Sequence, residues 1–193
     1  MKYKKNKNFL GLVATFLILS CSSQITVLDP NIPKPVIASS NLSAAIKYPD
    51  NFEDFSHEEQ IIGEDKWQIR LGGSNKILFN KLFSSIFNDF IILDKDSALE
   101  STIDILIEPE IEAFEFSVPK QSQTNAFAVW IRYRIKIYDN KGKTIANWPI
   151  SAYGKSETGT FSDNNDLGHA AILAMRDAAA LIILQIEKSS ILK

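Results

Sequence analysis

Cysteine is almost missing from this chain: Cys21 is the only one among 193 residues. One thiol excludes an internal disulfide framework and any zinc site built from several cysteines. Basic charge is also scarce beyond the N-terminus. Residues 1–20 hold four lysines and no acids, which leaves 17 Lys and Arg against 23 Asp and Glu, a balance of −6. Because a nucleic-acid binder needs a basic face, this composition argues against that class of protein.

The apolar run near the N-terminus is too short to span a bilayer. Residues 9–19 form a run of eleven, whereas a transmembrane helix needs about 20 apolar residues. The run follows a lysine-rich segment and precedes small residues, an order that is typical of a secretory signal. We therefore expect residues 1–20 to be a signal peptide.

The residues that end this signal form the most specific motif in the chain. Ile18, Leu19 and Ser20 precede Cys21, which resembles the lipobox of bacterial lipoproteins. The resemblance implies cleavage between Ser20 and Cys21, a diacylglycerol on the Cys21 thiol and an acyl chain on the new N-terminus. The alternative is an ordinary secretory signal that ends beside a cysteine by chance. Because Ser22 follows instead of aspartate, the resemblance implies the outer membrane and a domain that faces the periplasm.

The length of the chain allows one ordinary domain. Residues 21–43 are rich in proline, which disfavours helix and central strand and predicts an extended tether. A single domain is expected over residues 44–188, with a short tail at 189–193.

Hydrophobic periodicity predicts the elements of this domain. Residues 50–63 read as a polar loop or irregular helix, and Ser74 is a candidate helix cap. Pro109 and Pro149 indicate strand edges or bulges. Strands are expected near 44–48, 67–71, 103–108, 110–118, 126–138 and 143–153, helices near 75–88 and 166–188, and a short extended piece at 90–93 after the first helix. This order predicts an α+β fold, a two-layer sandwich in which a mainly antiparallel sheet of four to five strands carries two helices on one face.

The order of elements over residues 43–188 resembles that of YajG-type and LptE-type envelope lipoproteins. The local features that carry the resemblance are the strand-turn-strand segment at 133–148 and the alanine-rich segment at 174–181. Both are matches of pattern without a catalytic signature. The resemblance implies a small periplasmic accessory lipoprotein. The lipopolysaccharide translocon that LptE-type proteins serve is not carried over, because no motif here identifies such a partner.

Several polar groups have both a chemical and a structural interpretation. His57 lies beside two glutamates and could touch a metal, but a solvated loop is the expected state, and His169 is expected to be structural or exposed. The turn at residues 72–74 could hold an anion at a helix N-terminus, but it lacks the remainder of a phosphate-binding motif. Four glutamates could bind calcium or act as an acid–base pair, but the solvent face of a strand is expected: Glu108, Glu110, Glu112 and Glu115. No metal site or catalytic residue is predicted.

The strand at 126–138 has two unlike faces. One face is apolar from Phe127 to Ile137. The other face holds Trp130, Arg132, Arg134, Lys136 and Tyr138. Because arginine and aromatic residues are enriched at interfaces, this face is a candidate partner surface, and the alternative is an ordinary solvated face.

These features together predict a membrane-anchored periplasmic lipoprotein that is a non-enzymatic accessory or assembly partner in the cell envelope. We expect an envelope protein as partner, no nucleic acid, and no cofactor beyond the lipid on Cys21. The alternative is a lipid- or glycan-binding envelope module, with its ligand in a groove between the helix at 75–88 and the sheet.

Overall fold

The computed structural model describes residues 22–27, 29–33, 35, 37–62, 66–97, 101–159, 165–189 and 191–192. The predicted signal peptide, its cleavage site and Cys21 lie outside these residues. Eight strands and three helices follow one another in this part of the chain: β1 (Ser22–Thr26), β2 (Ser40–Lys47), β3 (Ser56–Gln60), β4 (Lys66–Arg70), α1 (Gly72–Ile86), β5 (Phe87–Leu93), β6 (Ile105–Ser117), α2 (Pro119–Ser122), β7 (Ala126–Asp139), β8 (Thr144–Glu157) and α3 (Asp166–Lys188).

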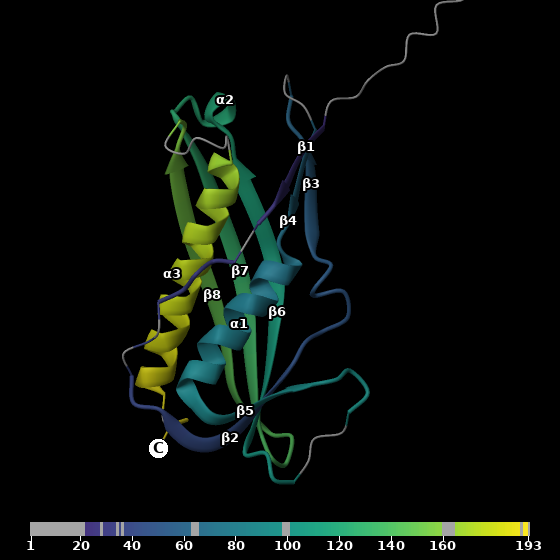
Figure 1. The fold of residues 1–193 in the computed structure, drawn as a ribbon, viewed down its shortest axis with the longest axis vertical. Coiled ribbons are helices and arrows are strands. Elements are labelled where there is room, and N and C mark those ends of the chain that lie inside the picture. The colour runs from purple at the N-terminus through teal and green to yellow at the C-terminus, as the bar shows by residue number, and fades with distance from the viewer. Residues whose placement is uncertain are drawn as a thin grey trace, which may run out of the picture.

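Two sheets organise the fold (Figure 1). The larger has the strand order β5-β2-β6-β7-β8, and the smaller has the order β1-β4-β3. The α+β class is confirmed, but the prediction of one mainly antiparallel sheet needs correction, because there are two sheets and both are mixed. Strand β2 runs parallel to β5 and β6, and β1 runs parallel to β4. The chain between β2 and β5 holds two strands and a helix, and parallel neighbours require a long crossover of this kind.

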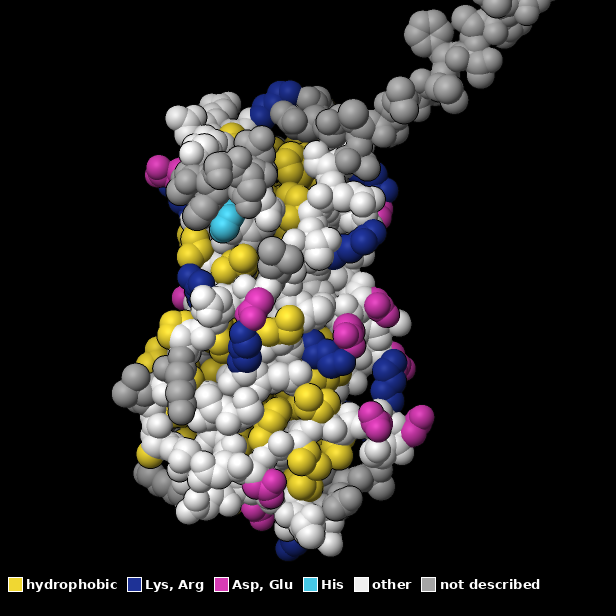
Figure 2. Space-filling view, viewed as in Figure 1, with side chains coloured by type: hydrophobic (Ala, Val, Ile, Leu, Met, Phe, Trp, Pro, Cys, Tyr) yellow, Lys and Arg dark blue, Asp and Glu magenta, His cyan; other side chains and the backbone are white. Residues whose placement is uncertain are grey.

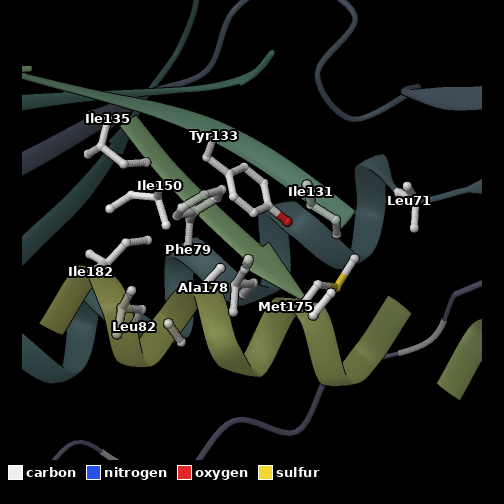
Figure 3. Packing of buried hydrophobic residues seen from close by; sticks show 14 of the residues in the cluster. Leu71, Phe79, Leu82, Ile131, Tyr133, Ile135, Ile150, Met175, Ala178 and Ile182 are labelled. Carbon is white, nitrogen blue, oxygen red and sulfur yellow. The ribbon is translucent and has the colours of Figure 1, made fainter. Parts of the chain in front are cut away.

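Helices α1 and α3 lie side by side on one face of the larger sheet, as predicted (Figure 1). The apolar face of β7 is buried beneath them, from Val129 to Ile137. Figure 3 shows Phe79 of α1 beside Tyr133 and Ile150 of the sheet, close to α3. On this side of the molecule, basic and acidic side chains are interspersed (Figure 2). The short helix α2 was not predicted.

Strand β3 is absent from the sequence prediction because its residues lack an apolar alternation. Its sequence is Ser-His-Glu-Glu-Gln, and its side chains alternate between exposed and half-buried. The strand lies at the edge of the smaller sheet and pairs antiparallel with β4. An edge strand of this kind is held by backbone hydrogen bonds to one neighbour, so hydrophobic periodicity does not reveal it.

Pro109 and Pro149, which the sequence placed at strand edges or bulges, lie at such positions. Pro109 is in β6, followed by a register shift between Ile111 and Ala113. The pairing of β2 with β6 ends at Ile107, so Pro109 needs no donor on that side. Pro149 is in β8, which is an edge strand. Ser74, in contrast, does not cap α1: the helix begins at Gly72, and the Ser74 hydroxyl donates to the Val27 carbonyl.

The segment expected to be a free tether joins the folded body before residue 44. Strand β1 pairs with β4 from Ser22 onward. The described residues between 27 and 39, here called the N-terminal strap, then cross the outer side of the two helices toward β2 (Figure 1). The Lys81 ammonium of α1 pairs with Asp29, and the Arg176 Nε of α3 donates to the Pro30 carbonyl over 2.8 Å. The strap therefore fixes the N-terminal strand to the domain.

Candidate interaction surface

The face of β7 opposite the helices is open, as the sequence predicted. Its five candidate side chains range from half-buried to exposed, and Trp130 keeps 45% of its surface accessible. Strands β6 and β8 flank β7, so the surface spans three strands. The sheet therefore presents the predicted residues on one continuous face.

The basic residues of this face are paired with the glutamates of β6. Register places Glu110 opposite Arg134, and the bulge lets Glu112 reach two arginines. The Arg134 Nε donates to Glu112 over 2.7 Å, the Arg132 Nε lies 3.4 Å from the same carboxylate, and Lys136 lies 3.5 Å from Glu110. Sequence reasoning treated these glutamates and the basic stripe as separate features, because strand register was unknown. Together they form one face on which basic and acidic side chains are paired.

Two groups on this face have pKa values that differ from their ordinary values. The hydrogen bond from Arg134, with Arg132 and Lys136 nearby, holds the pKa of Glu112 below its ordinary value despite an opposing effect of burial. Burial, with the neighbouring Glu108 carboxylate, raises the pKa of Tyr138. The charged form of Glu112 is therefore the one that the folded state favours.

Acid should weaken the domain partly through Glu112. Because its pKa is lower in the folded state, its stabilisation is complete above the unfolded pKa of about 4.3 and disappears as the pH falls through the folded value. As the pH falls from neutral to acidic, we expect the Glu112→Gln variant to lose less free energy of unfolding than the parent. Urea unfolding at neutral and acidic pH measures this loss. Glu115→Gln, opposite Trp130 instead of a cation, is the matched control. Identical acid sensitivity in the parent and Glu112→Gln would contradict the assignment.

A shallow hollow of about 350 Å³ lies on this open face. Register explains it, because small residues flank Arg132 on both sides, with Ala113 on β6 and Ser151 on β8. The adjacent row across the three strands holds large side chains, namely Glu115, Trp130 and Tyr153. The hollow is lined by Ala113, Glu115, Trp130, Ile131, Arg132, Ser151, Ala152 and Tyr153.

Two aromatic rings form one wall of the hollow. The ring centroids of Trp130 and Tyr153 are 5.2 Å apart, and Tyr153 is 44% exposed. The amide of Tyr153 donates to the Asp177 carboxylate of α3 over 3.0 Å, which holds this part of the edge strand against the helix. Sequence reasoning missed Tyr153, Glu115 and Ser151 as members of the surface, and a correct pairing of three strands would have found them.

The other candidate groups have structural surroundings. His57 is on β3, 3.4 Å from Glu59, and its ring contacts Phe114 and Phe116. His169 lies in the first turn of α3. Within the described ranges, no group of three or more His, Cys, Asp or Glu residues could hold a metal ion. At Gly72, a Cβ atom would lie 2.1 Å from the Glu53 carbonyl, so close backbone packing explains this glycine at the strand-to-helix turn.

Core side chains fill the space between α1 and the sheet, so the prediction of a ligand groove there is wrong. Leu78, Phe79 and Leu82 are fully buried there. The Tyr133 hydroxyl donates to the Asn75 side-chain oxygen, and the Asn75 amide donates to the Leu71 carbonyl over 3.0 Å. Burial raises the pKa of Tyr133. This space is therefore a core with a satisfied polar pair instead of a binding site.

Helix α3 has the length and apolar composition that crossing a membrane would require. Half of the relevant window is buried inside the fold, however. The small residues Ala170, Ala171, Ala174 and Ala178 face the sheet and bring the helix close to it. Packing on the sheet therefore accounts for the apolar composition of α3.

The chain matches no protein-family model and no curated protein. Three solved structures with some likeness are uncharacterized lipoprotein B from Nitrosomonas europaea, PelC from Paraburkholderia phytofirmans (solved as a dodecamer) and lipoprotein GNA1162 from Neisseria meningitidis. Their identities to this chain are 12%, 12% and 11%, and their TM-scores are 0.42–0.44 for the first two and 0.33 for the third. In the same order, the aligned parts cover 77%, 78% and 86% of this chain. They cover 83%, 92% and 99% of the three solved chains. At these values they carry no functional conclusion, and the resemblance to YajG-type and LptE-type proteins stays a prediction.

Proposed function

We propose that this protein is a lipid-anchored accessory protein of the bacterial envelope, without a catalytic step of its own. The observation that carries the proposal is the lipobox at Ile18 to Cys21, which directly precedes the first residue of β1. Acyl chains on Cys21 would hold the domain at the periplasmic side of the outer membrane. Two or three chains are needed for a lasting anchor, because one chain binds only marginally.

Anchoring gives the domain its mechanism. Restriction to a membrane surface raises its effective concentration near other membrane-bound proteins, so a modest interface is enough for capture. The open face of β6, β7 and β8 offers such an interface, with Trp130, Tyr153 and Arg132 around the hollow. Aromatic and arginine side chains contribute most to protein interfaces. The Glu112 pairing holds Arg134 in place, while Arg132 keeps 56% of its side chain exposed for a partner.

Crosslinking in intact cells tests both parts of the proposal. We expect Trp130→Ala, Arg132→Ala and Arg134→Ala together to lower the yield of a specific crosslinked envelope protein by on the order of tenfold or more, because each hot-spot side chain contributes about 2 kcal/mol. The mass of the mature N-terminus reports the acylation of Cys21 in the same cells.

A second triple variant is the control for the crosslinking. Leu184→Ala, Glu187→Ala and Lys188→Ala remove exposed side chains from α3 instead, and they should leave the yield unchanged. Equal crosslinking by the parent and both triple variants would contradict the partner surface. An unmodified Cys21 thiol in the mature chain would contradict the anchor.

The hollow also favours a second candidate, an envelope glycan as ligand. Aromatic faces beside a few polar groups are the usual composition of small-ligand sites, and here Glu115, Arg132 and Ser151 lie beside the two rings. The ligand-binding alternative therefore moves from the filled α1 groove to the open face. Recovery of a saccharide instead of a protein through the same surface would favour this candidate over the first.

A further inference from the structure

The free end of the smaller sheet lies at the point where the lipid would be attached. Register aligns Ser22 of β1 with Lys66 of β4, and Lys66 with Gln60 of β3. Neighbouring strands lie about 4.8 Å apart, so the three residues form one end of the sheet. Cys21 directly precedes Ser22, and an extended residue spans at most about 3.6 Å. The lipid attachment point is therefore within one residue of this end.

An apolar side chain projects from the same end. Ile61, which directly follows β3, is buried, whereas Ile62 is 97% exposed, the largest exposed fraction of any large hydrophobic residue in the described part of the chain. Ile62 lies two residues after Gln60, the last residue of β3. The end of the β3–β4 hairpin therefore directs an apolar side chain outward beside the lipid attachment point.

We propose that Ile62 inserts into the lipid bilayer as a second membrane contact beside the acyl chains of Cys21. This inference rests on the proposed lipid anchor. Pairing of β1 from Ser22 onward leaves no spacer between the anchor and the folded body, so the hairpin end is held at the headgroup region. Burial of apolar area there is favourable.

The charges near this end indicate which lipid property matters. Lys66 is paired with Glu58 across the hairpin, and Glu64 and Asp65 follow Ile62 in the sequence, so this end has no excess of basic charge. The contact therefore depends on apolar burial and does not need anionic headgroups. Two contacts, the anchor and Ile62, restrict how the domain tilts, which sets the direction in which its open face points.

Site-specific spin labels test the proposal on the lipidated full-length chain. Ile62→Cys and Ile145→Cys are each labelled with a nitroxide after reconstitution into phosphatidylcholine vesicles; acylated Cys21 carries a thioether and does not react. Ile145 is the matched control, because it is 42% exposed and follows the β7–β8 turn at the opposite end of the molecule (Figure 1). We expect collisions with a water-soluble nickel chelate to be several-fold rarer at position 62 than at position 145.

Three results would overturn the proposal, and they differ in what else they affect. If the mass of the mature chain shows acylated Cys21 and both labels collide equally with the chelate, Ile62 lies in water and only this inference fails. If Cys21 proves unmodified, the lipid anchor fails together with it. Stronger protection of position 62 only in vesicles that contain phosphatidylglycerol would overturn the apolar basis of the contact.

Discussion

Replacing Gly154 by alanine should destabilise the domain by about 3 kcal/mol, because the added methyl group would collide with the backbone of α3. A Cβ atom at this position would lie 2.0 Å from the Ala170 carbonyl oxygen and 2.3 Å from the Ala174 nitrogen. Neither atom can move unless the whole helix moves away from β8. The alanines of α3 make this close approach possible, and Gly154 completes it on the side of the strand. Urea unfolding measures the expected loss.

Gly73→Ala is the control for this substitution. No atom lies within 4 Å of the Cβ that it would add, and alanine is the better helix former, so this variant should be unchanged or up to about 1 kcal/mol more stable. Equal stability of the Gly154→Ala variant and the parent would show that α3 lies farther from β8 than the structure has it.

Phe79→Ala should destabilise the domain by about 3–5 kcal/mol. Phe79 is fully buried between α1 and the sheet, with its ring edge-on to Tyr133 at a centroid distance of 5.4 Å. Its removal leaves a cavity lined by apolar side chains, and such cavities bind small apolar molecules. We therefore expect benzene to raise the thermal midpoint of the variant and to leave that of the parent unchanged.

Ile77→Ala, two residues earlier on the same helix, is the matched control. Its side chain is partly exposed, so the change in stability should stay within about 0.5 kcal/mol. Stabilisation of the parent by benzene would contradict the finding that the space between α1 and the sheet is filled, and would restore the ligand groove that the sequence predicted there.

The parts of the fold that the sequence predicted are those with strong periodicity. Strand β7 and helix α3 were found nearly to their ends, because each buries one regular apolar face. The two missed strands, β1 and β3, contain mostly polar residues and are the edges of the smaller sheet. The proline-rich composition that predicted a free tether is equally compatible with the N-terminal strap, whose position depends on contacts to Lys81 and Arg176.

Only part of the candidate surface was predicted, because the rest depends on how the strands pair. Alternation along one strand is local information, and it placed Trp130 and Arg132 correctly on the open face. The pairing of Glu112 with Arg134 depends on the register of β6 after its bulge. The ring contact between Trp130 and Tyr153 depends on the register of β8. Neither register can be read from hydrophobic pattern alone, because the bulge changes the phase of the alternation.

The position of β2 between β5 and β6 sets an order of events when the chain folds. Ala44 pairs with Phe90 on one side and Ile105 on the other, 46 and 61 residues later in the chain. A polypeptide that emerges from its N-terminus exposes the apolar stretch Ala44 to Ile46 long before either neighbour emerges. In the β6–β7–β8 meander, in contrast, each strand pairs with the next strand along the chain, so its partner emerges soon after it. β2 is therefore among the first strands to emerge, and it stays without a neighbour in the larger sheet until β5 has followed it.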